Sequence, residues 1–160
     1  MKTAPFALAA LAVAFAFSGC ATLTESRSVT EARATMAAEI QAEAPGNYFI
    51  GRRYYKVDYK FWGYIRKPGQ PWTEAKLVLL NENRRQAPDR EGGTLGADNG
   101  YEYKLFGSFS GDTVYEPASN GFYPEFVLTG YELRAATPAP IFSPQGPALD
   151  PTRRVIVTPY

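Results

Sequence analysis

The stretch Tyr101-Glu102-Tyr103-Lys104-Leu105-Phe106-Gly107-Ser108-Phe109 decides the fold of this chain. Apolar or small residues occupy every second position of residues 101–109, as in a strand that buries one face. Gly107 stands inside the run, where glycine weakens a strand unless the backbone must bend sharply or approach another segment closely. The stretch therefore predicts a β-strand with a strong local bend.

Two further segments repeat this arrangement of one glycine inside a β-favouring run: Phe61-Trp62-Gly63-Tyr64 and Leu128-Thr129-Gly130-Tyr131. Small barrels need such bends. We therefore expect a mostly β fold, a small curved antiparallel barrel of the oligonucleotide/oligosaccharide-binding (OB) kind with five to six strands. A small β-sandwich and an up-and-down barrel are the alternatives. A simpler explanation of the pattern is a ring covering a bare glycine across two strands.

The remaining elements of the expected domain follow from alternation and from turn residues. They are an alternating strand over residues 57–65, a buried strand over 75–80, a tight turn at Ser110-Gly111-Asp112 that makes a hairpin with residues 113–115, and a strand over 125–133. Residues 84–100 are polar and rich in glycine, which predicts a loop outside the core. Its oxygen-bearing residues (Asp89, Glu91, Asp98 and Asn99) fit no calcium-loop spacing and indicate a solvated loop.

The beginning of the chain is typical of an export signal. Lys2 precedes an apolar run over residues 4–17 that is short for a membrane-spanning helix, and Ser18-Gly19 supplies the small residues that a signal peptidase requires. Cys20 is the only cysteine, so it has no disulfide partner within the chain. An ordinary secretory signal and a retained anchor helix are the alternatives.

Phe17-Ser18-Gly19-Cys20 resembles the lipobox of bacterial lipoproteins, with Phe17 in place of the usual leucine. The resemblance implies that residues 1–19 are a signal peptide that is removed, and that Cys20 then carries acyl chains such as palmitate. Two or more acyl chains hold a protein stably on a membrane. Ala21, a residue other than aspartate after the cysteine, implies sorting to the outer membrane, in a leaflet that the sequence does not specify.

The expected organisation is therefore a tether, a helix, a barrel and a tail. The tether covers residues 20–27, the helix 28–44, the barrel 46–134 and the proline-rich tail 135–160, with a last edge strand expected over 153–158. Ser28-Val29-Thr30-Glu31 fits a helix-capping box, and Pro45-Gly46 ends the helix. Another resemblance lies just after it: Pro45-Gly46-Asn47-Tyr48-Phe49-Ile50-Gly51-Arg52 is similar to the starvation-inducible outer-membrane lipoproteins, which implies an outer-membrane β domain.

Charge and residue composition exclude several classes of function. Once residues 1–19 are removed, 16 basic residues face 16 acidic ones, which together with export disfavours nucleic acid as a partner. The arginine pairs at 52–53, 84–85 and 153–154 are typical of solvated surface. The chain has no histidine, which disfavours a Ser-His-Asp triad and a histidine-based zinc site. Its only cysteine is assigned to lipid, which disfavours a thiol enzyme and a thiolate metal site. We expect no cofactor and no metal.

Carboxylates are the remaining catalytic candidates. Asp112, Glu116 and Glu125 flank one hairpin and its following loop, and a pair of them could serve glycoside hydrolysis. Acidic residues at turns and strand ends are far more common than catalytic pairs. We therefore expect that the protein is not an enzyme.

An aromatic segment is the best candidate for a recognition surface. It is Tyr115-Glu116-Pro117-Ala118-Ser119-Asn120-Gly121-Phe122-Tyr123-Pro124-Glu125-Phe126, a stretch stiffened by two prolines. The candidate binding residues are Tyr115, Phe122 and Tyr123, together with Trp62, Tyr64 and Trp72. The simpler interpretation, which the sequence favours over recognition, is that the loop folds over the end of the barrel and its rings plug the core.

The expected function is that of an outer-membrane-anchored lipoprotein of structural or protein-interaction type. Its expected partners are the membrane, through the lipid, and an envelope protein or a cell-wall glycan. A periplasmic glycan- or small-ligand-binding module is the alternative, followed by a carboxylate-dependent cell-wall hydrolase.

Overall fold

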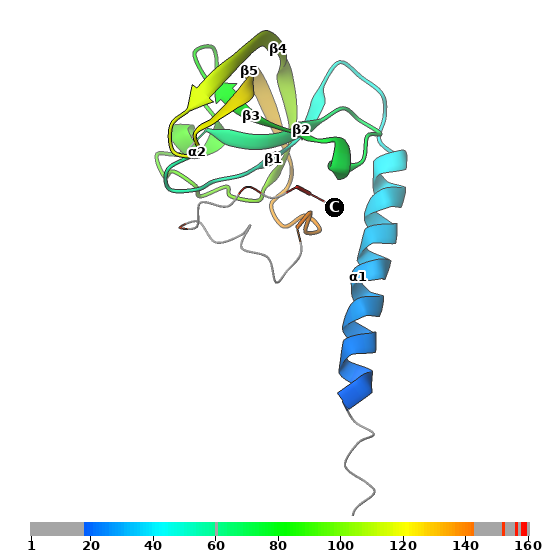
Figure 1. Ribbon diagram of the computed structural model, residues 1–160. Coiled ribbons are helices and arrows are strands. Elements are labelled where there is room, and N and C mark those ends of the chain that lie inside the picture. Colours follow the sequence, from blue (N-terminus) through cyan, green and yellow to red (C-terminus); the bar gives the residue numbers. More distant parts are fainter. Residues whose placement is uncertain (1–17, 60, 143–151, 153–155, 157, 160) are drawn as a thin grey trace, which may run out of the picture. The chain divides into compact units, whose positions relative to one another are not determined.

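A computed structural model describes residues 18–59, 61–142, 152, 156 and 158–159, with side chains described from residue 29 onward. The chain divides between Met36 and Ala37 into two units, which are described separately. The first contains most of helix α1 (Ser18–Gln41), and the second contains the end of that helix and a β-barrel (Figure 1). The expected signal peptide lies outside the described residues, apart from residues 18 and 19.

Helix α1 differs in its bounds from the helix expected over residues 28–44. It begins at Ser18, so residues 20–27 belong to the helix, whereas a separate tether was expected there. Ala21 and the alanines further along the helix favour this, because alanine has the highest helix propensity. The helix ends before Pro45-Gly46, and its last turn is closed by the N–H of Ala42, which donates to the carbonyl of Ala38 at 3.1 Å.

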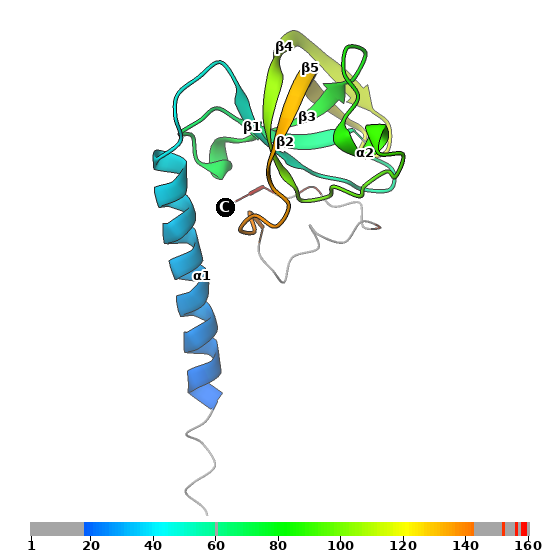
Figure 2. The ribbon, with the colours of Figure 1, turned by 180° about the vertical axis from the view of Figure 1, so that it is seen from behind.

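The second unit is a closed five-stranded barrel, which confirms the expected fold class (Figures 1 and 2). The strands are β1 (Phe49–Arg53), β2 (Trp62–Arg66), β3 (Lys76–Asn81), β4 (Glu102–Glu116) and β5 (Gly121–Ala135). Around the barrel they follow the order β1-β2-β3-β5-β4, and β4 closes onto β1. Four of these pairings are antiparallel as expected, and the β3–β5 pairing is parallel. Two short helices, η1 (Trp72–Glu74) and α2 (Pro88–Glu91), lie between strands.

The tight turn expected at Ser110-Gly111-Asp112 is wrong. Strand β4 runs through these residues, because Phe109 pairs with Phe126 and Thr113 pairs with Pro124 across an irregularity in the register. Gly111 has a φ of 95°, which glycine adopts without strain. Residues 110–112 therefore form a β-bulge that bends one long hairpin, and the chain reverses further on, at residues 117–120.

The glycines that interrupt the strands meet different physical requirements. Gly107 has a φ of 150°, and a Cβ atom there would overlap the carbonyl oxygen of Val127 on the neighbouring strand. This confirms the close backbone approach expected for a bent barrel strand. A Cβ on Gly130 would instead lie 3.5 Å from the ring of Phe106. The ring thus covers a bare glycine, as the simpler explanation held.

The two faces of β2 belong to two different apolar layers. Ile65 lies in the inner core, whose buried members are Ile65, Val78, Leu80, Ala87, Tyr103, Leu105, Phe126 and Leu128. Because side chains alternate along a strand, Trp62 and Tyr64 lie on the opposite face. There they form an outer aromatic layer with Tyr54, Tyr59 and Phe142.

The first part of the proline-rich tail belongs to the packed structure. Ile141 and Phe142 are 1% and 5% exposed, although the tail was expected to have no core of its own. The ring of Phe142 lies 5.6 Å from that of Tyr54 and 5.4 Å from that of Tyr64. Their apolar side chains cover the outer face of the barrel, so the packed unit extends past residue 134. Most of the edge strand expected over 153–158 lies outside the described residues.

Candidate functional site: the β4–β5 hairpin tip

The far end of the β4–β5 hairpin forms a two-stranded ribbon. Residues 113–116 of β4 pair with residues 121–124 of β5. Strand β1 pairs with β4 only over residues 102–105, and β3 pairs with β5 only over residues 125–127. In the described part of the chain, no other strand pairs with this end. We call residues 113–124 the hairpin tip.

The turn of the hairpin tip satisfies its own polar groups. Asn120 has a φ of 52°, a conformation that asparagine before glycine commonly adopts in tight turns. The carboxylate of Glu116 accepts hydrogen bonds from the N–H groups of Ala118 at 2.9 Å and Ser119 at 2.7 Å, and from the Ser119 hydroxyl at 2.7 Å. Glu116 is buried and is the only charged residue of the tip. The tip therefore shows almost no charge to solvent.

Two aromatic rings stand exposed on this ribbon. Tyr115 and Phe122 are directly paired across the strands, with ring centroids 5.2 Å apart. Tyr115 is 48% exposed and Phe122 is 70% exposed. The Tyr115 hydroxyl donates a hydrogen bond to the Asn120 side chain at 3.0 Å. The result is a small, preformed apolar patch, so at these two positions the rings do not plug the barrel core.

Tyr123 connects the hairpin tip to the barrel. Its ring packs against that of Trp62 at 4.9 Å, and its hydroxyl donates to the Ser119 hydroxyl oxygen at 2.9 Å. The aromatic segment thus divides: Tyr115 and Phe122 face solvent, whereas Tyr123 packs on the barrel.

The other three candidate binding residues are buried. Trp62, Tyr64 and Trp72 are at most 2% exposed. Trp62 stacks on Tyr59 with ring centroids 4.0 Å apart. The ring of Trp72, in η1, contacts the guanidinium groups of two arginines, with its centroid 5.1 Å from that of Arg52 and 4.6 Å from that of Arg66. The structure therefore does not bring these rings together with Tyr115 and Phe122 on one surface.

Two of the three candidate catalytic carboxylates, those of Glu116 and Glu125, have structural partners. Glu116 caps the turn, and Glu125 accepts a hydrogen bond from the Asn81 side chain at 2.9 Å. Asp112 lies in the β-bulge, where its N–H donates to the Ser110 hydroxyl. Over the described residues, no group of three or more Cys, His, Asp or Glu side chains is placed to hold a metal ion.

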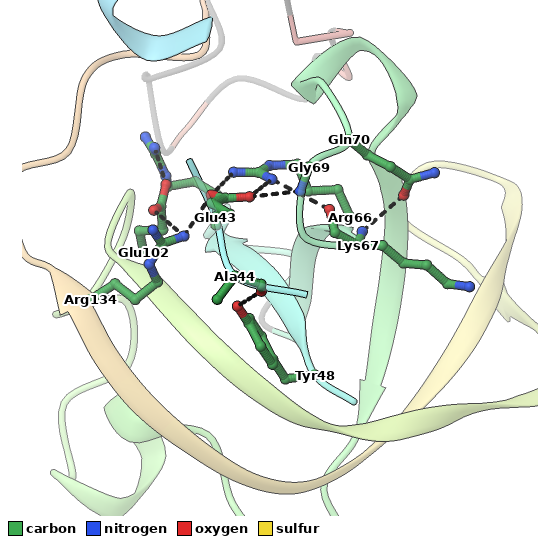
Figure 3. Close-up of polar contacts among 10 residues, drawn as sticks. Glu43, Ala44, Tyr48, Arg66, Lys67, Gly69, Gln70, Glu102 and Arg134 are labelled. Carbon is green, nitrogen blue, oxygen red and sulfur yellow. Dashed lines mark hydrogen bonds and ion pairs between the residues drawn. The ribbon is translucent and has the colours of Figure 1, made fainter. Parts of the chain in front are cut away.

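Sequence reasoning missed a buried ionic cluster around Glu43, just after α1 (Figure 3). Arg66 donates two hydrogen bonds to its carboxylate, at 2.6 and 2.7 Å, and Arg134 donates a third at 2.9 Å. The N–H of Gly69 donates a fourth at 3.0 Å. Burial alone would raise the pKa of Glu43, but these hydrogen bonds outweigh it and lower the pKa from 4.5 to about 2. Glu43 therefore fixes the segment after α1 to the barrel.

The same cluster continues to Glu102. Arg52 donates to Glu102 at 2.7 Å and to the carbonyl of Ala139 in the tail at 3.0 Å. Arg134 forms an ion pair with Glu102 at 3.3 Å. Burial lowers the pKa of Arg52, and the hydrogen bond and charge of Glu102 partly oppose this shift. The cluster thus also holds the beginning of the tail.

A second buried ionic cluster corrects the expectation for residues 84–100. Arg53 donates to Asp89 at 2.8 Å and to Asp98 at 3.2 Å, and both carboxylates are buried. Burial raises the pKa of Asp98 above its ordinary value, and the charge of Arg53 opposes this shift only in part. The segment is therefore not a solvated loop outside the core, because it supplies the counter-ions of a buried arginine and the core residue Ala87.

The predicted lipidation site lies at the beginning of α1. Cys20 falls within the first turn of the helix, and its side chain is outside the described part of the structure. The described residues contain no helix that is long and apolar enough to cross a membrane.

Comparison of the chain with models of protein families, with curated proteins and with solved structures finds no match. The two resemblances to lipoproteins therefore depend on the quoted motifs alone.

Proposed function

We propose that this chain is a non-catalytic lipoprotein, anchored in the bacterial outer membrane through Cys20, that acts by presenting the hairpin tip as an interaction surface. The single observation that carries the interaction role is the exposed pair of Tyr115 and Phe122 at the end of a stiff ribbon. Large exposed rings that are held together at one point are typical of contact sites.

Anchoring is supported by the sequence. Phe17-Ser18-Gly19-Cys20 follows a short apolar run, and acylation would occupy the only thiol of the chain. Ala21 supports outer-membrane sorting. Because the acyl chains supply the membrane affinity, the barrel needs no membrane-spanning segment of its own.

A non-catalytic role is supported by the use of the polar residues. Glu43, Glu102, Asp89 and Asp98 are engaged by buried arginines, and Glu116 is engaged by its own turn. These groups serve to hold segments of the chain together. A glycan-binding role has less support, because three of the six candidate aromatic residues are buried.

The anchoring proposal is tested by expressing the full chain in a Gram-negative host that is supplied with labelled palmitate. We expect the wild type to incorporate label and to fractionate with the outer membrane. Cys20→Ala should lose the label and leave the outer-membrane fraction. Ala21→Asp is the matched control: it should keep the label but move to the inner membrane. Equal fractionation of wild type and Cys20→Ala would contradict the proposal.

A further inference from the structure

We propose that the hairpin tip docks onto the lipid bilayer itself, with the rings of Tyr115 and Phe122 inserted between the head groups and the acyl chains. This inference rests on the proposed function, because the lipid on Cys20 would keep a bilayer within reach. It assigns a second, shallow membrane contact to a folded part of the chain.

The charge of the hairpin favours a lipid surface. The only charge of the tip, the Glu116 carboxylate, is turned into the hairpin and accepts three hydrogen bonds there. Asp112, an exposed carboxylate of the hairpin, lies outside the tip, in the β-bulge. Residues 105–133 contain no lysine or arginine. The tip can therefore enter a membrane interface without removing a solvent-exposed charge from water, because the Glu116 carboxylate is already buried and hydrogen-bonded. The tip also has no cation that would make docking depend on anionic lipid.

The two tyrosine hydroxyls of the tip are also hydrogen-bonded. The Tyr115 hydroxyl is bonded to Asn120, and the Tyr123 hydroxyl is bonded to Ser119. Tyrosine with an apolar ring and a bonded hydroxyl is enriched at membrane interfaces. The packing of Tyr123 on Trp62 holds the tip against the barrel, so docking requires no refolding of the hairpin.

The size of the patch distinguishes a bilayer from a protein partner. With exposures of 48% and 70%, the two side chains together offer roughly 180–300 Å² of surface, since one aromatic residue buries about 150–250 Å². A stable protein interface needs about 800 Å² on each partner. The patch alone is too small for such an interface, whereas shallow insertion needs only the rings.

The test places a fluorophore at the tip of the full chain. Phe122→Trp is purified from membranes and reconstituted into phosphatidylcholine vesicles, with or without bromine on the acyl chains as a quencher. Leu133→Trp is the matched control, because Leu133 is 56% exposed and lies on the same strand, near its other end. The native Trp62 and Trp72 are buried and contribute the same background to both variants.

We expect brominated chains to remove about half of the added fluorescence at position 122 and little at position 133, as for rings buried about 5–10 Å into the interface. Adding phosphatidylglycerol should not strengthen the quenching. Equal quenching at the two positions, or none at position 122, would overturn the inference. If quenching is absent and Tyr115→Ala/Phe122→Ala abolishes the pull-down of an envelope protein, the tip instead serves a protein partner.

The experiment distinguishes a failure of the anchoring proposal from a failure of tip docking. The mass of the same purified chain reports whether Cys20 carries lipid. A lipidated chain without quenching at position 122 refutes tip docking and leaves the anchor standing. For a chain without lipid, flotation with the same vesicles still tests the tip. Vesicle binding that is lost in the Tyr115→Ala/Phe122→Ala variant supports docking, and the absence of vesicle binding by the wild type refutes it.

Discussion

Replacing Glu43 by glutamine should destabilise the barrel in a way that depends on pH. The folded state lowers the pKa of Glu43 from 4.5 to about 2. A shift of this size corresponds to about 3–4 kcal/mol of stability at pH 7, since one pKa unit is worth about 1.4 kcal/mol. Arg134 is 34% exposed and its contribution is screened by water. We therefore expect Glu43→Gln to lose about 2–3 kcal/mol at pH 7.

The sign of the pH dependence follows from the direction of the shift. A carboxyl group with a lowered pKa binds fewer protons when folded, so its stabilisation is present above pH 4.5 and is lost as the pH falls toward 2. Urea unfolding of wild type and Glu43→Gln, followed by the fluorescence of the buried Trp62 and Trp72, should show a gap that closes over this range.

Glu132→Gln is the matched control for this experiment. Glu132 is 62% exposed and pairs with Lys104 at 3.5 Å. Its substitution should change the free energy of unfolding by less than about 0.5 kcal/mol. Two results would refute the reasoning: a loss at Glu43→Gln as small as in this control, or a gap that stays constant down to pH 2.

Two further predictions concern packing. Phe142→Ala should lower the free energy of unfolding by about 3 kcal/mol in urea titrations, because it empties a buried aromatic site. Phe122→Ala is the control at an exposed ring and should lower the free energy of unfolding by less than about 0.5 kcal/mol. Equal losses in the two variants would show that the tail does not cover the barrel. Gly107→Ala should cost more than about 3 kcal/mol or abolish folding, because its Cβ would overlap the carbonyl oxygen of Val127 at a φ of 150°. Gly111→Ala is the control, because a Cβ there meets nothing within 4 Å, and it should cost about 1 kcal/mol in the same thermal or urea measurement. A Gly107→Ala protein as stable as Gly111→Ala would contradict the close approach of Gly107 to the Val127 carbonyl.

The barrel was predictable from the sequence because its strands carry local signals. Alternation of apolar residues and the interrupting Gly107 and Gly130 are visible in short windows. The hairpin turn was placed wrongly for a related reason. Ser110-Gly111-Asp112 and Asn120-Gly121 are both typical of turns, and only the pairing of β4 with β5 decides that the first is a bulge.

The ionic clusters were not predictable, because their partners are far apart in the sequence. Arg53 lies 36 residues from Asp89 and 45 from Asp98. Paired arginines in a sequence are usually solvated, and only the closed barrel reveals that Arg52 and Arg53 point to two different buried clusters. Likewise, the exposure of Phe122 and the burial of Trp72 depend on which segments cover them. Residue type alone does not distinguish an exposed contact ring from a packed one.

The intact mass of the chain extracted from membranes tests the central claim most directly. The proposal predicts a polypeptide that lacks residues 1–19, begins at Cys20 and carries the additional mass of acyl chains on that residue. A chain that retains Met1, or that begins at residue 20 without added lipid, would contradict it.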